Sequence, residues 1–246
     1  MYGDNMHTHI VAIIPARGGS KGIPDKNIRE FAGRPLIAHT IASAKESERI
    51  TRIIVSTDSE KIAGIAKEYG AEVPFLRPPE LAQDKSPVAD AVLHILSELK
   101  QRELYEPDCI VLLQPTSPLR NSGDIDGVIN LLEKSGADSV VTVTETEPLV
   151  YTRSPEGELR LISDESFLSS TNRQELNRTY KLDGSMVYAV TARSFLETQS
   201  FLGGKLFGYV IPRWRAVDLD EPQDFLVGEL VYKNAHAIKQ ALDGFK

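Results

Sequence analysis

A glycine-rich loop with three basic residues follows the first apolar run of the chain. The run covers residues 10–14 and ends at Pro15, and its lack of polar alternation is typical of a strand buried on both faces. The loop contains Arg17, Gly18, Gly19, Ser20, Lys21, Lys26 and Asn27. Glycines let backbone N–H groups approach an anion, and basic side chains neutralise its charge. Phosphates often bind where a buried strand ends in an open α/β sheet, so the sequence predicts a phosphate site in this loop.

The loop matches neither of two common phosphate-binding patterns. A P-loop needs Gly-x-x-x-x-Gly-Lys-Ser/Thr, whereas here Ser20 precedes Lys21 and the glycine spacing differs. A dinucleotide fingerprint needs a glycine two residues after Gly18, where Ser20 stands. A solvated turn is the alternative interpretation, but the position directly after the first strand favours a phosphate loop of a different kind.

Two aspartates near the C-terminus are candidates for metal binding. On an extended segment Asp218 and Asp220 project to one face and Leu219 to the other. Two such carboxylates repel each other unless a cation or a basic group lies between them. Mg²⁺ prefers oxygen ligands and often combines one or two carboxylates with substrate phosphates. Asp-x-Asp pairs also occur by chance, so the pair alone is a weak signal, and the phosphate loop strengthens it.

The first half of the chain alternates short apolar runs with amphipathic stretches. Strands are predicted at residues 10–14, 52–56, 72–75, 109–113 and 139–143. Helices are predicted at residues 35–47, 59–69, 88–99 and 125–132. This alternation predicts an α/β fold with a mostly parallel sheet and helices on both faces.

After about residue 145 the pattern changes. A hairpin is predicted at 150–163, a core strand at 185–191 and a last helix at 222–242. We expect a single domain over residues 1–246, with an inserted segment at 147–183.

Charge and composition exclude several classes of protein. The formal net charge is −7, whereas general nucleic-acid binding usually needs a basic face. The chain has no apolar run of the roughly 18–20 residues that a membrane span needs. Its first residues lack the basic start and apolar segment of a signal peptide. These features predict a cytoplasmic protein that binds neither nucleic acid nor membranes.

Several long motifs carry a resemblance to a known family. They are IPARGGSKGIPDKNIREFAGRPLIAHTI, VSTDSEKIAGIAKEYGAEVPFLRPPELAQDKSP, VLLQPTSPLRNSGDID, NRQELNRTYKLDGSMVY and AVDLDEPQDF. In this order they resemble the acylneuraminate cytidylyltransferases, also called CMP-sialic acid synthetases. The resemblance implies a Rossmann-like, GT-A-like nucleotidyltransferase fold.

The resemblance also implies roles in nucleotide binding. Arg17, Gly18, Gly19, Ser20, Lys21 and Lys26 would contact the triphosphate of CTP, and Asn27 the nucleotide. Arg77 and Ser86 would lie near the cytidine, although an arginine followed by two prolines equally suits a loop brace. Asp218 and Asp220 would hold Mg²⁺, and Arg17 and Lys26 would take part in catalysis.

The sugar-acid contacts implied by the resemblance come from three segments. Gln114 would hydrogen-bond the sugar acid, although its loop is also typical of a turn that proline stiffens. Arg173 and Gln174 match a family Arg-Arg-Gln motif whose first arginine is Asn172 here. Tyr188 matches an aromatic position near the sugar pocket and equally suits a core strand. The inserted segment would form a homodimer and reach toward the neighbouring active site.

The implied reaction is an in-line displacement. The anomeric hydroxyl of a nonulosonic acid, such as N-acetylneuraminic, legionaminic or pseudaminic acid, attacks the α-phosphorus of CTP, and pyrophosphate leaves. A transferase that forms an NDP-sugar is one alternative, and a catalytically silent nucleotide- or sugar-binding protein is another. The sequence does not indicate which nonulosonic acid is the substrate.

Overall fold

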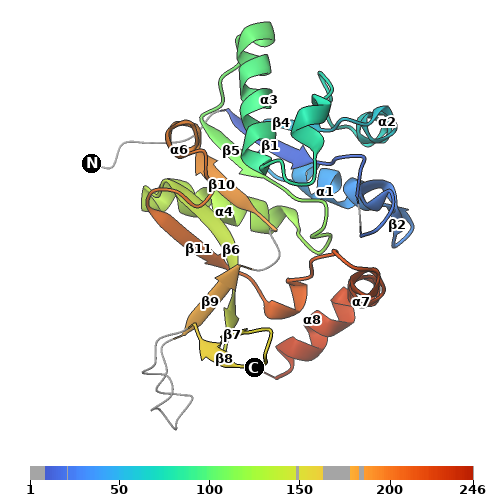
Figure 1. The fold of residues 1–246 in the computed structure, drawn as a ribbon, viewed down its shortest axis with the longest axis vertical. Coiled ribbons are helices and arrows are strands. Elements are labelled where there is room, and N and C mark those ends of the chain that lie inside the picture. The colour runs from blue at the N-terminus through green and yellow to red at the C-terminus, as the bar shows by residue number, and fades with distance from the viewer. Residues whose placement is uncertain (1–8, 21, 148–149, 163–177, 183–185, 246) are drawn as a thin grey trace.

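The computed structural model describes residues 9–20, 22–147, 150–162, 178–182 and 186–245. Within these residues a seven-stranded mixed sheet forms the centre of the molecule (Figure 1). In spatial order its strands are β11 (Leu206–Val210), β6 (Ser139–Thr146), β10 (Tyr188–Thr191), β5 (Cys109–Leu112), β1 (Ile10–Pro15) and β4 (Arg52–Ser56), and β9 (Thr179–Leu182) also pairs with β6. β10 and β9 run antiparallel to their neighbours, whereas the other strands share one direction. The predicted mixed, mostly parallel α/β fold is confirmed.

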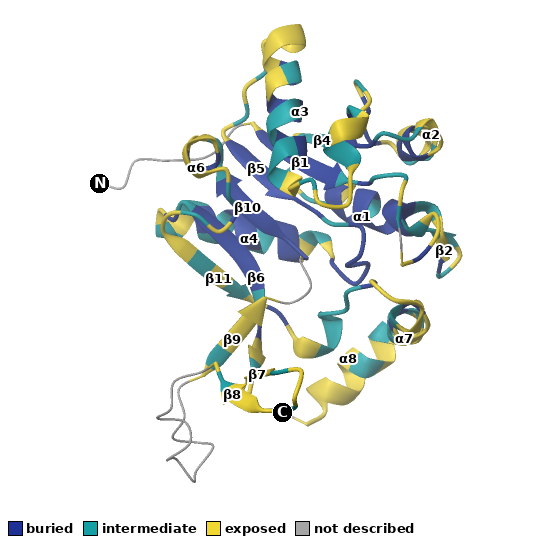
Figure 2. Ribbon diagram, viewed as in Figure 1, coloured by how far each residue is buried: buried dark blue, intermediate teal, exposed yellow. Residues whose placement is uncertain are grey.

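Helices cover both faces of the sheet because successive side chains of a strand point to opposite sides. Ile10, Ala12 and Ile14 of β1 belong to one buried cluster, and Val11 and Ile13 belong to another. The first cluster includes residues of α1 (Leu36–Lys45), α2 (Glu60–Glu68) and α4 (Ser122–Ser135). The second includes residues of α3 (Val88–Glu103) and α6 (Ala192–Thr198). Figure 2 shows the resulting buried centre between exposed outer helix faces.

Most predicted elements of the first half are confirmed to within a few residues. Strands are present where they were predicted at 10–14, 52–56, 109–113 and 139–143, and helices at 35–47, 59–69, 88–99 and 125–132. The predicted cap of α2 is also present, since the side chain of Ser59 accepts a hydrogen bond from the backbone N–H of Ile62.

Two predictions were wrong. Residues 72–75 do not form a strand, and Glu72 makes only an isolated parallel bridge with Ile54, because Pro74 lacks the N–H that a longer ladder needs. The predicted helix at 222–242 is two helices, α7 (Pro222–Lys233) and α8 (Ala235–Asp243), which meet at Asn234. β11 and α6 were not predicted.

The described part of the inserted segment consists of a short hairpin and of β9, which pairs with β6 of the central sheet. β7 (Tyr151–Arg153) and β8 (Leu159–Leu161) pair antiparallel, which confirms the predicted turn between them. The strand predicted at 185–191 is present as β10, although residues 183–185 lie outside the described part. In the described residues, no helix combines the length and apolar character that crossing a membrane requires.

A third, smaller hydrophobic cluster lies apart from the main core. We call it the edge cluster, and it consists of Ile23, Phe31, Leu36, Leu219 and Phe225. It joins the glycine-rich loop, the hairpin of β2 (Glu30–Phe31) and β3 (Arg34–Pro35), the start of α1 and the start of α7. The edge cluster therefore holds the loop against the segment that carries the two aspartates.

His39 of α1 is buried next to the edge cluster. Its Nε2 lies 2.8 Å from the carbonyl oxygen of Phe31, and its Nδ1 accepts a hydrogen bond of 3.2 Å from Arg34. The Nε2 atom therefore carries the proton, because an acceptor faces it and a donor faces Nδ1. Burial lowers the pKa of His39 from 6.5 to about 4, and the charge of Arg34 adds to this effect.

We expect the free energy of unfolding to fall as the pH drops from 6.5 to 4. In this range the unfolded chain protonates His39 and the folded protein does not, which costs about 3 kcal/mol once the pH is below both pKa values. Chemical denaturation of the wild type and of His39→Gln between pH 4 and 7 measures the effect. The variant should lose this part of the pH dependence, and an equal slope in both proteins would contradict the assignment.

Candidate active site

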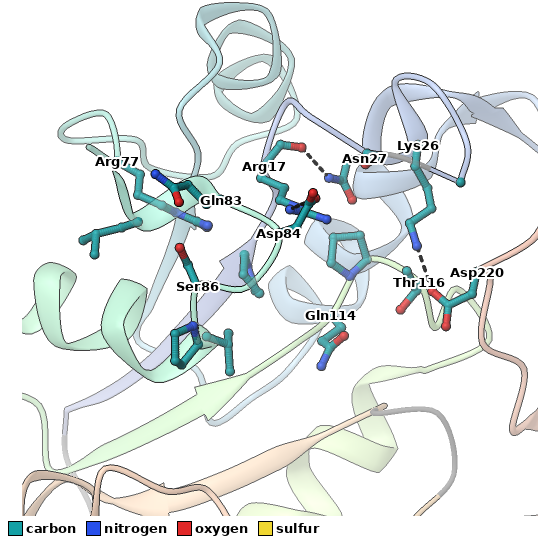
Figure 3. Close-up of a pocket in the computed structure, with 17 residues that line it drawn as sticks. Arg17, Lys26, Asn27, Arg77, Gln83, Asp84, Ser86, Gln114, Thr116 and Asp220 are labelled. Atoms are coloured by element: carbon teal, nitrogen blue, oxygen red, sulfur yellow. Dashed lines mark hydrogen bonds and ion pairs between the residues drawn. The ribbon is translucent and has the colours of Figure 1, made fainter. Parts of the chain in front are cut away.

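A cavity of about 560 Å³ opens where β1 and β5 end. Arg17, Ser20, Gly22, Lys26 and Asn27 of the glycine-rich loop line it, together with Arg77, Leu81, Gln83, Asp84, Ser86, Gln114, Thr116 and Asp220. Figure 3 shows Arg77, Gln83 and Ser86 at one end of the cavity and Lys26, Thr116 and Asp220 at the other. The cavity thus brings together residues from four segments that are far apart in the sequence, namely 15–27, 77–88, 114–116 and Asp220.

Ion pairs orient two basic side chains of the loop. Arg17 Nη1 lies 2.7 Å from a carboxylate oxygen of Asp84, and Lys26 Nζ lies 2.9 Å from a carboxylate oxygen of Asp220. Asn27 is buried, and its side-chain amide donates a hydrogen bond of 3.0 Å to the carbonyl oxygen of Arg17. Both basic groups are therefore held at the cavity by carboxylates, which phosphates of a nucleotide can replace.

The other loop residues play different parts. The backbone N–H of Gly18 donates a hydrogen bond of 2.8 Å to the carboxylate of Asp58. In this conformation the N–H therefore binds a protein carboxylate. Gly18 and Gly19 are not among the residues that line the cavity, whereas Ser20 is. Lys21 lies outside the described residues.

Gly22 permits a close approach between the loop and the aspartate segment. A Cβ atom at this position would lie 3.1 Å from the backbone oxygen of Asp220. Real Cβ atoms rarely come this close to backbone atoms. The absence of a side chain at Gly22 therefore lets the loop lie directly against Asp220.

Arg77 serves as a brace and also lines the cavity. It is buried, and its guanidinium donates to the hydroxyl and to the carbonyl oxygen of Ser56 at 2.9 and 2.6 Å. Burial lowers the pKa of Arg77. Ser86 donates to the carbonyl oxygen of Glu80 over 3.0 Å. The two residues predicted near the cytidine thus lie on one wall of the cavity, and both stabilise the chain around it.

Gln114 begins a loop that a buried arginine anchors. Arg120 is 4% exposed and donates hydrogen bonds to the carbonyl oxygens of Gln114 and Met186 and to the hydroxyl of Thr40. These contacts fix the backbone of Gln114 while its side chain faces the cavity (Figure 3). The sequence reasoning assigned no role to Arg120.

The two aspartates differ in their surroundings. Leu219 is fully buried between them, as the predicted alternation requires. Asp220 lines the cavity, and its side chain is 67% exposed. Asp218 lies beside the cavity and forms a hydrogen bond with the Thr116 side chain. Burial raises the pKa of Asp218, and the charge of Asp220 raises it further, whereas the Thr116 hydrogen bond and the charge of Lys26 lower it.

In the part of the chain that the structure describes, one carboxylate oxygen of Asp218 lacks a hydrogen-bond partner and is available to bind a cation. Its Oδ1 is buried and has no hydrogen-bond partner within the described residues. Those residues include no group of three acidic, histidine or cysteine side chains that could hold a metal. Asp218 and Asp220 therefore fit an ion that takes its remaining ligands from phosphates and water. This arrangement is common for Mg²⁺.

Not all predicted substrate contacts meet at the cavity. Tyr188 is 8% exposed and belongs to a core cluster in which its ring packs edge-on against Phe201. It is absent from the residues that line the cavity. Arg173 and Gln174 lie outside the described residues.

Sequence reasoning also missed four polar side chains around the site. They are Asp58, Asp84, Thr116 and Arg120. Thr116 and Arg120 lie in the VLLQPTSPLRNSGDID motif, and Asp58 and Asp84 lie in VSTDSEKIAGIAKEYGAEVPFLRPPELAQDKSP. Their membership of these motifs was the available signal.

If a phosphate of CTP takes the place of Asp84 at Arg17, the variant Asp84→Asn should bind CTP about 2- to 5-fold more tightly. This range corresponds to the small free energy of a partly exposed ion pair. Calorimetric titration with CTP measures the dissociation constant. Glu80→Gln removes an exposed carboxylate from the same segment and serves as the control. Weaker CTP binding by Asp84→Asn alone would show that Asp84 assists the nucleotide instead.

Comparison with known proteins identifies the family. The family model described as cytidylyltransferase matches residues 11–191. The CMP-N,N'-diacetyllegionaminic acid synthase of Legionella pneumophila is 39% identical over 89% of this chain and 94% of its own length. The N-acylneuraminate cytidylyltransferase of Escherichia coli is 36% identical over 89% of this chain, which spans 51% of that relative's length. The pseudaminic acid cytidylyltransferase of Campylobacter jejuni is 31% identical over 92% of this chain and 97% of its own length.

Solved structures agree on the fold. A CMP:2-keto-3-deoxy-manno-octonic acid synthetase complexed with CTP superposes with a TM-score of 0.68 at 16% identity, over 93% of this chain and 100% of the other. A 4-diphosphocytidyl-2C-methyl-D-erythritol synthase from Anaerococcus prevotii gives a TM-score of 0.63 at 14% identity, over 92% of this chain and 98% of the other. The family model covers residues 11–191, and the relatives from Legionella pneumophila and Campylobacter jejuni align along nearly their whole length. The chain is therefore a member of the cytidylyltransferase family.

Proposed function

We propose that this protein transfers CMP from CTP to the anomeric hydroxyl of a nonulosonic acid and releases pyrophosphate. The observation that carries the proposal is the single cavity shared by Arg17, Lys26, Gln114 and Asp220. The names of the relatives point to the same substrate class, because they describe synthesis from legionaminic, neuraminic and pseudaminic acids.

In this reaction the basic residues neutralise the charge of the phosphates. Arg17 presents a planar fork to phosphate oxygens, and Lys26 supplies a compact positive charge. Both are already oriented at the cavity by carboxylates. As pyrophosphate leaves, these fixed charges offset the negative charge that develops on it.

Asp218 and Asp220 would hold Mg²⁺, and the unpartnered Oδ1 of Asp218 supports this assignment. When bound, the ion would supply charge neutralisation at the phosphates and acidify the attacking hydroxyl. Lys26 Nζ lies 2.9 Å from a carboxylate oxygen of Asp220 and would orient that carboxylate. Gln114, which also lines the cavity, would orient the sugar acid.

We also propose that the protein is a homodimer and that it works in the cytoplasm, where CTP is available. The described part of the inserted segment exposes a set of apolar side chains, namely Tyr151, Leu159, Ile162, Tyr180 and Leu182. Apolar side chains gathered on one projecting segment are typical of an interaction surface. Arg173 and Gln174 would then approach the partner's cavity. Sedimentation equilibrium tests the dimer, and a monomer at micromolar concentration would contradict it.

Pyrophosphate release is the decisive test of the reaction. CTP and Mg²⁺ are supplied with N-acetylneuraminic, legionaminic or pseudaminic acid, and with the eight-carbon acid Kdo as a control. We expect release with one of the nonulosonic acids and a CMP-sugar as the product. An NDP-sugar from a sugar phosphate would support the other transferase reaction. Calorimetric binding of CTP without turnover on any acid would favour a silent binder.

A further inference from the structure

Helix α7 begins two residues after Asp220 and carries a glycine in its interior. Gly228 is buried, although glycine is among the least favourable residues inside a helix. A Cβ atom at this position would lie 2.7 Å from Cδ2 of Leu219, 3.2 Å from Cγ1 of Val217 and 3.5 Å from the ring of Phe31. The first of these distances is shorter than real Cβ atoms show. The missing side chain therefore lets residues 217–219 lie directly against α7.

The segment beside Gly228 is the one that carries both aspartates. Leu219 is fully buried in the edge cluster, and its backbone N–H donates to the carbonyl oxygen of Thr116 over 3.0 Å. Asp218 and Asp220 flank Leu219 directly, so a displacement of Leu219 moves both carboxylates.

The edge cluster also contains Ile23 of the glycine-rich loop. Lys26 stands three residues further on and pairs with Asp220. The close approach of Gly228 to Leu219 thus affects the positions of the two aspartates relative to Lys26.

We infer that Gly228 is a positioning residue that sets the place of Asp218 and Asp220 relative to the glycine-rich loop. This inference rests on the proposed function. A methyl group at position 228 would clash with Cδ2 of Leu219. Because the Leu219 side chain is fully buried and has little room to turn aside, we expect the backbone of residues 218–220 to shift, and the two carboxylates with it. Chemistry is sensitive to displacements of this size, since a shift of about 1 Å can lower a rate about 100-fold. Most residues that line the cavity come from other segments, so the proposed contacts with CTP should stay in place.

The test compares two glycine-to-alanine variants in helix interiors. Gly228→Ala is expected to lower kcat about 10- to 100-fold and to change the dissociation constant of CTP by less than about 3-fold. Gly64→Ala in α2 is the matched control, because a Cβ atom at Gly64 meets nothing within 4 Å. Its kcat should equal that of the wild type. The inference is overturned if folded Gly228→Ala keeps kcat within about 2-fold of the wild type.

A rescue experiment separates positioning from a general loss of stability. Leu219→Ala removes the atom that a Cβ at position 228 would contact first. We therefore expect Leu219→Ala/Gly228→Ala to have a kcat within about 3-fold of Leu219→Ala alone. This comparison also tests the inference if Gly228→Ala by itself does not fold. A kcat of the double variant more than about 3-fold below that of Leu219→Ala would overturn the inference. A wild type without turnover would instead count against the proposed function.

Discussion

Asp220→Asn is expected to lower kcat by about 10²- to 10³-fold while the protein stays folded. Asp220 would hold the Mg²⁺ that neutralises the reacting phosphates, and loss of part of this electrostatic stabilisation has an effect of this size. Asp220 is 67% exposed, so the exchange of an oxygen for an amide group costs little stability. Steady-state pyrophosphate release with saturating CTP, sugar acid and Mg²⁺ measures kcat, and the thermal midpoint reports folding.

Combining the two aspartate substitutions shows whether the carboxylates act together. If Asp218 and Asp220 hold the same ion, the double variant Asp218→Asn/Asp220→Asn should be at most about 10-fold slower than the slower single variant. Two independent roles would multiply the losses. Mg²⁺ titrations of each single variant should show a higher concentration for half-maximal rate.

Asp25→Asn is a suitable control for the aspartate series. Asp25 is next to Lys26 in the sequence, but its carboxylate pairs with Lys61 in an exposed ion pair of 2.9 Å. Asparagine tolerates the left-handed backbone of this position, where φ is 55°. A near wild-type kcat is expected for this control. If Asp220→Asn were equally active, the proposed metal site would be wrong.

The parts of the fold that follow from local patterns were predictable from the sequence. β1 and β5 are continuous apolar runs because both faces of these strands are buried. Ser59 and Gly70 mark the two ends of α2 by capping chemistry that acts within a few residues. β11 escaped prediction because Leu206 and Val210 are exposed on an edge strand, where burial imposes less of a pattern.

The candidate site was predictable where motif residues carry charge at the ends of strands. Arg17, Lys26, Gln114 and Asp220 were each assigned to the site, and the structure brings them to one cavity. Ion pairs between residues on different segments of the site depend on the tertiary structure. The partner of Asp84, for example, is Arg17, which is 67 positions away in the sequence. No periodicity encodes such a contact.

Arg120 is the clearest case of a residue whose importance only the structure reveals. It is an arginine buried to 4% exposure, and its guanidinium satisfies polar groups from three separate segments. Its replacement leaves the carbonyl oxygens of Gln114 and Met186 without these donors in a buried setting. Each buried polar group left without a partner costs about 1–3 kcal/mol.

Arg120→Met should therefore destabilise the protein by about 3–6 kcal/mol. For a chain of this length that corresponds to a thermal midpoint lower by about 10–20 °C. Calorimetry or far-UV circular dichroism measures the midpoint. Arg193→Met is the control, because the Arg193 side chain is 87% exposed and forms an ion pair with Glu197 one helical turn away. Its loss should leave the thermal midpoint within about 2 °C of the wild type.

A milder replacement connects this anchor to the reaction. Arg120→Lys keeps the positive charge but lacks the planar fork that reaches several acceptors at once. Because Arg120 fixes the backbone of Gln114, we expect the lysine variant to show a raised KM for the sugar acid. Its dissociation constant for CTP should be unchanged, since Arg17 and Lys26 are positioned by other contacts. A thermal midpoint of Arg120→Met within about 2 °C of the wild type would show that water or neighbouring donors replace the guanidinium, and the anchoring role would then be wrong.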